Sequence, residues 1–206
     1  MRSNAWDARI ERARELRSAY PFASEGLKFY ERIAVFQKSL FFEIEAACGA
    51  ARTPCSPGFL RKEFDSFLLL PHFGRFLSLV KEIAPEALAQ CAQYLAAQGG
   101  SRWLDLLMQF WEGGAASPAS LEPREALLSW IFLQPYAEYL SSHAEWTPPA
   151  GTPPLCPLCD GKPQAGALRP EGDGGKRFLV CALCSLEWGS TGASCVHPAV
   201  KRMSAS

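Results

Sequence analysis

The sequence lacks the features that mark exported and membrane-embedded proteins. Its opening stretch, MRSNAWDARIERARELRSAY, is charged and has no apolar core, so it does not resemble a secretory signal peptide. No apolar run approaches the roughly 20 residues that a membrane-spanning helix needs. The formal net charge is zero, with 21 basic and 21 acidic residues, so no positive excess favours nucleic acid or an anionic membrane. We therefore expect a cytoplasmic protein with neither a nucleic-acid nor a membrane partner.

Histidine is scarce, with three residues among 206, and no Glu-x-x-His motif is present. A carboxylate-bridged metal site inside a helical bundle needs that motif, so we exclude such a site. His72 and His143 stand alone and are expected to lie at the surface or to form local hydrogen bonds. Cysteine is more abundant, and five of the eight residues lie after position 155. The other three are expected to be small buried core residues: Cys48, Cys55 and Cys91.

Residues 1–145 are predicted to form an all-helical, bundle-like domain, so the fold class is mainly α. Apolar residues recur at intervals of three and four, and one such series marks a buried helix face: Phe29, Ile33, Phe36, Leu40 and Ile44. Proline and glycine divide this part into six or seven helices, with separate helices over 59–70 and 71–84. Residues 52–58 are predicted to be a loop. Pro135 is expected to kink the last helix, because proline lacks an N–H and clashes with the preceding turn.

A proline-rich linker is predicted at residues 146–154, which read WTPPAGTPP. Residues 155–206 then form a second, smaller unit, a rubredoxin-like or zinc-ribbon module with an irregular tail. Within it, strands over 165–169 and 177–180 are expected to flank a hairpin turn at 171–175.

The spacing C-x2-C-x21-C-x2-C in this module is typical of a metal site with four thiolates. The predicted ligands are Cys156, Cys159, Cys181 and Cys184. Each C-x-x-C pair is expected to form a tight turn, here called a knuckle, and Gly161 is expected to supply a positive φ in the first one. A unit this small needs such a staple, since metal binding contributes roughly 10 kcal/mol or more to the folding of small metal domains.

A redox dithiol is the alternative to a metal site. Such a pair normally lies at a strand-to-helix junction, and the sequence shows no strand–helix–strand pattern around these cysteines. Iron and zinc both accept four thiolates, and the sequence CPLCDG is similar to a rubredoxin knuckle, so one ion of either metal is expected. Four cysteine ligands leave no open coordination position for a reactive water. We therefore expect a protein that is not an enzyme.

Six segments of the chain follow the pattern of a known family. Three surround the cysteines: CPLCDGKP at 156–163, GKRFLVC at 175–181 and CALCSLEW at 181–188. Three lie in the helical part and keep the same order: LKFYERIAVFQ at 27–37, LLLPHF at 68–73 and FLQPYAEYL at 132–140. In these segments the chain resembles the FdhE family of formate dehydrogenase accessory proteins.

The resemblance implies a cytoplasmic assembly factor, similar to a chaperone, that binds the catalytic subunit of formate dehydrogenase. It also implies iron bound as in rubredoxin. Two other functions stay open: a rubredoxin-like electron-transfer or redox-sensing protein, and a zinc ribbon that binds nucleic acid. The charge of the module disfavours nucleic acid, because its four basic residues are matched by four acidic ones: Lys162, Arg169, Lys176 and Arg177 against Asp160, Glu171, Asp173 and Glu187.

The family pattern continues with a second pair of C-x-x-C motifs, and this chain departs from it there. Cys195 stands where the second module would begin, but its partner position is Pro198. We therefore expect a shortened member with one metal module and a degenerate tail. The alternative is that Cys195 and His197 form half of a ligand set that a homodimer completes.

Overall fold

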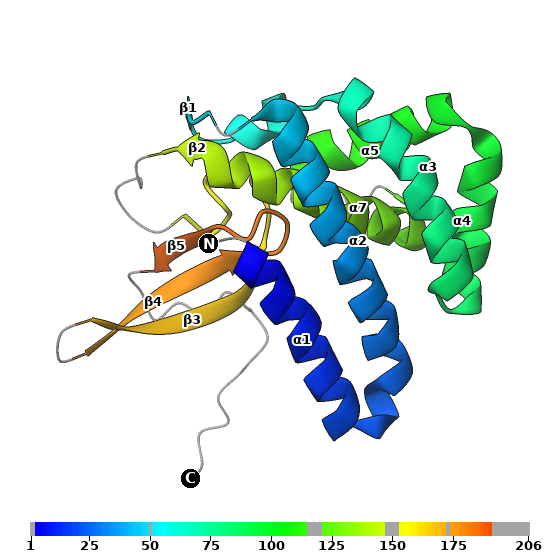
Figure 1. Cartoon of the computed structure of the whole chain (residues 1–206). Coiled ribbons are helices and arrows are strands. Elements are labelled where there is room, and N and C mark those ends of the chain that lie inside the picture. Colours follow the sequence, from blue (N-terminus) through cyan, green and yellow to red (C-terminus); the bar gives the residue numbers. More distant parts are fainter. Residues whose placement is uncertain (1–2, 50, 115–120, 147–152, 172–173, 191–206) are drawn as a thin grey trace, which may run out of the picture.

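Six α-helices and a three-stranded sheet account for most of the described chain in a computed structural model (Figure 1). The structure describes residues 3–49, 51–114, 121–146, 153–171 and 174–190. The helices are α1 (Ser3–Ala19), α2 (Ser24–Cys48), α3 (Ser66–Ile83), α4 (Glu86–Gln98), α5 (Gly100–Glu112) and α7 (Pro123–His143), with single 3-10 turns η1 (Pro21–Ala23) and η2 (Phe59–Lys62). The predicted mainly α class is confirmed. In this described part, none of the helices combines the length and apolar character that a membrane span requires.

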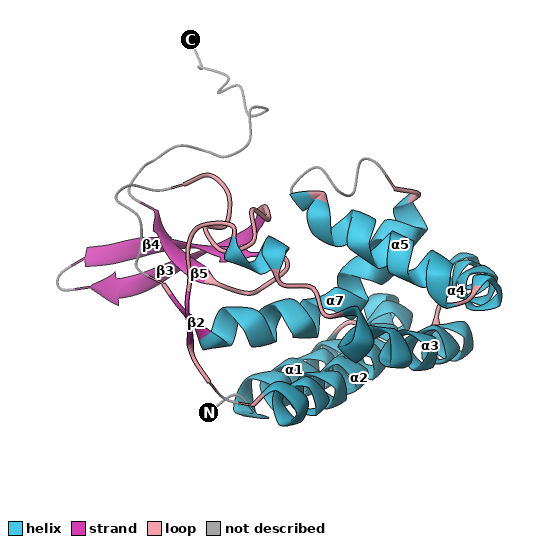
Figure 2. Ribbon diagram, turned by 90° about the horizontal axis from the view of Figure 1, so that it is seen from above, coloured by secondary structure: helices cyan, strands magenta, loops and turns pink. Residues whose placement is uncertain are grey.

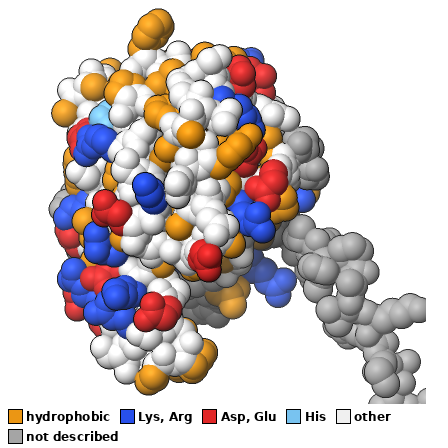
Figure 3. Space-filling view, turned by 90° about the vertical axis from the view of Figure 1, so that its right-hand side faces the viewer, with side chains coloured by type: hydrophobic (Ala, Val, Ile, Leu, Met, Phe, Trp, Pro, Cys, Tyr) orange, Lys and Arg blue, Asp and Glu red, His pale blue; other side chains and the backbone are white. Residues whose placement is uncertain are grey.

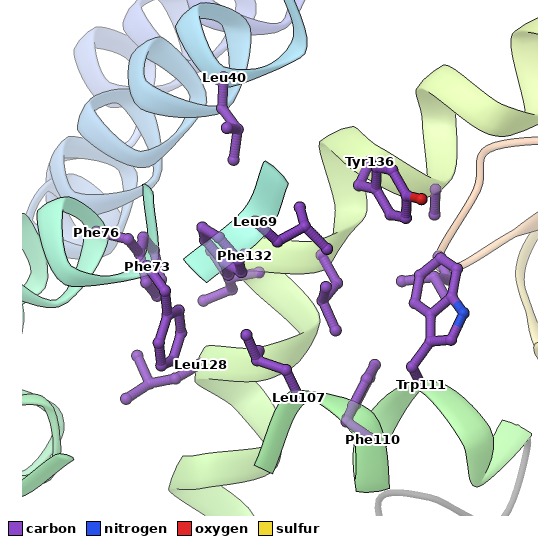
Figure 4. Close-up of a cluster of buried hydrophobic side chains, with 14 of the residues drawn as sticks. Leu40, Leu69, Phe73, Phe76, Leu107, Phe110, Trp111, Leu128, Phe132 and Tyr136 are labelled. Carbon is purple, nitrogen blue, oxygen red and sulfur yellow. The ribbon is translucent and has the colours of Figure 1, made fainter. Parts of the chain in front are cut away.

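The helical core forms around α7, which α2, α4 and α5 all contact. Phe132 of α7 packs edge-on against Phe73 of α3, with ring centroids 4.8 Å apart, and also lies against Phe76 (Figure 4). The face predicted for residues 29–44 is confirmed: Ile33, Leu40 and Ile44 are buried, and Phe29 and Phe36 are partly buried against the core. The apolar periodicity of the sequence therefore identified the residues that hold the helices together.

Pro71 lies inside α3, so the prediction of separate helices over 59–70 and 71–84 is wrong. The helix begins earlier because the Asp65 carboxylate accepts a hydrogen bond from the Leu68 N–H, 2.9 Å away, and so caps its first turn. A proline at position 71 removes only the hydrogen bond to the carbonyl of Phe67, a residue that is 92% exposed. Of the residues of the first predicted helix that precede α3, only 59–62 are helical, and they form η2.

Pro135 lies within α7 and is buried, as the sequence predicted for the last helix. Because proline has no N–H, the carbonyl of Ile131 loses its helical partner. The buried side chain of Gln37 replaces it: its Nε2 donates to the Ile131 oxygen at 2.7 Å and to Gln134 Oε1 at 3.0 Å. A glutamine on α2 thus compensates for the proline on α7 and fixes how the two helices pack.

The predicted loop at 52–58 contains a short strand that the sequence did not indicate. Strand β1 (Thr53–Pro54) pairs in parallel with β2 (Ala144–Glu145), which directly follows α7. The Cys55 N–H extends this ladder by donating to the Glu145 oxygen at 2.9 Å. The pairing holds the end of the helical part beside the loop, while most of the predicted linker, 147–152, lies outside the described residues.

Three antiparallel strands form the sheet of the C-terminal module, in the order β3–β4–β5. They are β3 (Pro163–Glu171), β4 (Gly174–Cys181) and β5 (Glu187–Ser190), and the sheet lies to one side of the helices (Figures 1 and 2). The predicted hairpin is confirmed and its strands are longer than expected, whereas β5 was missed. The turn residues 172–173 and the tail with Cys195 and His197 lie outside the described residues.

Candidate metal centre

Four cysteine sulfurs converge between the two knuckles of the C-terminal module. The Sγ atoms of Cys156, Cys159, Cys181 and Cys184 all lie within 4.8 Å of one another. Across the knuckles, Cys156 and Cys184 are 3.6 Å apart and Cys159 and Cys181 are 3.3 Å apart. These distances exceed the roughly 2.05 Å of a disulfide bond, and the four thiols are free. All four residues are buried, with at most 2% of their surface exposed.

The backbone of each knuckle turns sharply at the residue after its second cysteine. Asp160 has φ 53° and Ser185 has φ 56°, the left-handed conformation that side chains rarely adopt. Equivalent hydrogen bonds close both turns: the Cys156 N–H donates to the Gly161 oxygen at 2.8 Å, and the Cys181 N–H donates to the Leu186 oxygen at 2.9 Å. The two C-x-x-C pairs therefore have the same local turn, which brings each pair of sulfurs to one side.

The role of Gly161 in the site differs from the one that the sequence predicted. It is not among the positive-φ residues, since Asp160 takes that conformation, so the predicted backbone role is wrong. The reason for a glycine is space, because a Cβ at this position would lie 3.1 Å from the Cys159 sulfur and 3.2 Å from the Cys181 sulfur. A side chain at this position would therefore require the sulfurs to shift by a few tenths of an ångström.

Hydrogen bonds make the four thiols unequal. The Cys181 sulfur accepts from the backbone N–H groups of Leu183 at 3.4 Å and Cys184 at 3.5 Å. Hydrogen bonds from the thiol of Cys156, and then from those of Cys159 and Cys184, hold the pKa of Cys181 well below its usual range. Hydrogen bonding to Cys156 conversely raises the pKa of Cys159 and of Cys184, and burial adds to both effects. Buried thiolates cannot all ionise side by side unless a cation offsets their charge.

The sulfur arrangement fits a tetrahedral metal ion. A zinc–sulfur bond of about 2.3 Å corresponds to sulfur–sulfur distances of about 3.8 Å, close to the separations across the knuckles. Four buried cysteines this close together could hold one metal ion, and four thiolates suit zinc and iron alike. The assignment of these cysteines as metal ligands stays a prediction.

The first knuckle is bound to the turn at η2. The N–H groups of Gly58 and Leu60 each donate to a knuckle carbonyl at 3.0 Å, those of Pro157 and Leu158. Arg61 reaches further, since its Nε donates to the Cys159 oxygen and its guanidinium also donates to the Trp111 oxygen at the end of α5. The guanidinium thus places a fixed positive charge beside the candidate thiolates.

The second knuckle is bound to α7 and α1. The Trp130 indole N–H donates to the Ala182 oxygen at 3.1 Å. The hydroxyl of Ser185 donates to the carboxylate of Glu138 at 2.8 Å, and Arg9 of α1 pairs with the same carboxylate at 2.8 Å. Glu138 is only 9% exposed, and a carboxylate this buried needs a partner of opposite charge. Arg9 provides that positive charge.

Comparison with known proteins gives matches of one kind. Residues 155–191, which include all four cysteines, match the family described as FdhE, central domain. A protein named Protein FdhE homolog from Aquifex aeolicus is 23% identical over 201 residues, which cover 91% of this chain and 68% of that protein. Proteins of the same name from Stutzerimonas stutzeri and Pseudomonas putida are 46% and 33% identical over 44 and 87 residues. These findings support the FdhE family.

A solved structure agrees with the fold. The crystal structure of the FdhE protein from Pseudomonas aeruginosa matches with a TM-score of 0.62 and 20% identity, over 93% of this chain and 68% of that one. The match to the Stutzerimonas stutzeri protein covers 21% of this chain and 14% of that protein. The match to the Pseudomonas putida protein covers 39% of this chain and 25% of that protein. This chain therefore corresponds to part of the length of its FdhE relatives.

The remaining cysteines lie apart from the sulfur cluster. Cys48 is exposed and Cys55 and Cys91 are partly buried, so the expectation of buried core residues is wrong in degree. Cys55 donates to the Thr53 oxygen at 2.9 Å, and burial raises the pKa of Cys91 to about 11, which keeps that thiol protonated at neutral pH. None of the three is grouped with other candidate ligands within the described ranges.

Both described histidines form local contacts, as expected. His72 Nδ1 lies 3.2 Å from the Glu43 carboxylate, and His143 Nδ1 donates to the Tyr139 oxygen at 2.9 Å. The residues that bind the FdhE-like segment to the helices, above all Arg61, were not predicted from the sequence, because they lie far from the cysteines along the chain. No spacing rule signals such contacts.

Proposed function

We propose that this chain is a cytoplasmic accessory protein in the assembly of formate dehydrogenase and that it binds the catalytic subunit of that enzyme. The observation that carries the proposal is the buried four-sulfur cluster inside a segment that matches the FdhE central domain. Burial of all four sulfurs supports a role in holding the fold rather than in catalysis, because a closed site offers no position to a substrate. We accordingly propose that the chain is not an enzyme.

The proposed cofactor is one metal ion, zinc or iron, bound by Cys156, Cys159, Cys181 and Cys184. When bound, the ion would offset the charge of four thiolates and hold the two knuckles together. Protein purified without oxygen and analysed for metal content and visible absorption distinguishes the two, since a ferric site with four thiolates is coloured and a zinc site is colourless.

The surface supports a protein partner more than nucleic acid. On the face shown in Figure 3, basic and acidic side chains are interspersed rather than gathered into a basic stripe. Among the described residues, basic and acidic side chains form ion pairs, as in Arg75 with Glu43 at 2.8 Å and Arg102 with Glu125 at 2.6 Å. Nucleic-acid binding depends on contiguous positive charge, which this face does not offer.

The test is co-purification with the catalytic subunit of formate dehydrogenase under anaerobic, reducing conditions. Retention of the subunit by the wild-type protein is expected, and its absence contradicts the proposed function. A homodimer is a further proposal, which the molar mass in light scattering tests directly.

An electron-transfer role is the second candidate, favoured by the two N–H···S hydrogen bonds to Cys181. Such bonds tune the potential of iron–thiolate sites. A reversible one-electron couple in the iron-loaded protein would support this role, and a protein that contains only zinc would contradict it.

A further inference from the structure

A cavity of about 650 Å³ lies between the helices and the metal module. Phe110 of α5 and Ala126, Leu127 and Trp130 of α7 line one side. Residues 161–162 and 182–183 line the other. The hydrogen bond from the Trp130 indole to the Ala182 oxygen joins the two sides. In Figure 2 the sheet lies to one side of the helices, the side on which α7 leads into β2.

The side chains that line the cavity are apolar or basic. Apolar side chains form most of the lining, and the charged ones, Arg61 and Lys162, are both basic. No acidic, hydroxyl or amide side chain is among its described lining residues. The Trp130 indole N–H and two N–H groups of Arg61 are bound to protein carbonyls, whereas Lys162 is exposed and its ammonium can meet a ligand.

This lining suits a protein segment better than a small metabolite. Small-molecule sites use a few precisely placed polar groups to fix the orientation of the ligand, and on the described walls the Trp130 indole N–H and two N–H groups of Arg61 are already bound to protein carbonyls. Protein interfaces instead combine an apolar centre with charges at the rim. Leu127 is 40% exposed and offers apolar surface to a partner. The positive charge of Lys162 favours a negatively charged group of the partner beside it.

The second wall depends on the knuckles. Residues 161–162 are separated from Cys159 by one residue, Asp160, and residues 182–183 lie between Cys181 and Cys184. A Cβ built at Gly161 would lie 3.1 Å and 3.2 Å from two of the sulfurs, so this part of the wall passes directly beside the sulfur cluster. The cavity is therefore complete only while the four sulfurs are held together.

We propose that this cavity binds an extended segment of a client protein, one in which a large apolar side chain lies next to a carboxylate, and that binding requires the metal-loaded knuckles. The inference rests on the proposed accessory function, because it assumes a protein client. It adds the place on the chain, the chemistry of the segment and the dependence on metal.

Two variants test the cavity from opposite walls, Leu127→Asp and Lys162→Glu. Matched controls make the same changes elsewhere: Leu168→Asp on the exposed hairpin and Lys28→Glu on α2. The probes are two short synthetic peptides flanked by Gly and Ser, one with Phe-Leu-Glu at its centre and one with Phe-Leu-Lys. Binding is followed by fluorescence anisotropy on the full-length metal-loaded protein, with metal content and circular dichroism confirming that each variant is folded.

The Phe-Leu-Glu peptide is expected to bind more tightly than the Phe-Leu-Lys peptide. Leu127→Asp should weaken it by about tenfold or more, as for loss of an interface anchor. Lys162→Glu should weaken it by about fivefold, as for an exposed charge pair, and should reverse the preference between the peptides. Both controls should bind as the wild type does, and removal of the metal should abolish binding. Absence of peptide binding, or equal losses in Leu127→Asp and Leu168→Asp, overturns the proposal.

The intact catalytic subunit separates this inference from the proposed function. Equal binding of the subunit by wild type and by both cavity variants overturns the cavity and leaves the accessory role standing. Cavity-dependent peptide binding without any binding of the subunit contradicts the accessory role and supports the cavity as a site for another client.

Discussion

Replacing Gly161 with alanine tests whether the four sulfurs are metal ligands, because the added methyl group would press on two of them. The new Cβ would lie 3.1 Å from the Cys159 sulfur and 3.2 Å from the Cys181 sulfur, so these neighbours must move by a few tenths of an ångström. The backbone adds no strain of its own, since Gly161 is not in the left-handed region. The substitution therefore acts on the sulfurs alone.

The size of the effect follows from the tolerance of the site. Metal–sulfur distances vary by only about 0.2 Å, so a shift of a few tenths of an ångström cannot be absorbed without loss. Overpacking a dense site costs about 1–3 kcal/mol. If the cost falls on the metal-bound state, metal affinity drops by roughly 5- to 150-fold.

Competition with a metal chelator measures this affinity directly. The matched control is Gly166→Ala in β3 of the same module, where the nearest atom to a new Cβ is the Phe178 oxygen at 3.8 Å, an ordinary contact. This control should keep the wild-type affinity. Equal metal affinity in Gly161→Ala and wild type would refute the assignment of these sulfurs as a metal site.

Three further predictions concern the fold and the site. Gln37→Leu leaves the Ile131 carbonyl without a partner and should lower the free energy of unfolding by about 1–3 kcal/mol in urea titration, whereas exposed Gln90→Leu should change little. Substitution of Cys156 and Cys159 by Ser should unfold the ribbon. Because the predicted domain boundary lies at 146–154, the helical circular dichroism signal should persist. The melting temperature of the helical part should fall, because its contacts from η2 and α7 to the ribbon are lost. Complete loss of that signal would contradict two domains. Metal affinity should rise with pH. The raised pKa values of Cys159 and Cys184 keep these thiols protonated, so the metal must displace protons when it binds, and fewer protons compete at higher pH. Equal affinity at about pH 6 and pH 8 would contradict thiolate ligation.

The metal module was predictable because its information is local. Two C-x-x-C pairs specify two tight turns whatever the rest of the chain does, and the strand pattern between them specifies a hairpin. The same local reasoning failed for Gly161. The knuckle turns at Asp160 instead, and the need for glycine arises from sulfurs of both knuckles, one of which, that of Cys181, is 20 residues away in the sequence.

The helical part shows the same division between local and distant information. Periodicity identified the buried faces, but proline was misread at position 71, where a capping aspartate at position 65 already starts the helix. The strand at 53–54 has no pattern of its own and forms only because Glu145 lies beside it. Such pairings depend on residues that the fold brings together.

The sequence by itself determined the mainly α class, the buried helix faces and the four candidate ligands, because these follow from periodicity and spacing over a few residues. Only the tertiary structure decided what surrounds the sulfurs. Arg61 reaches the first knuckle and Trp130 the second, and the cavity between them exists because distant segments pack together. Packing between distant segments is a property of the whole fold, and no local pattern encodes it.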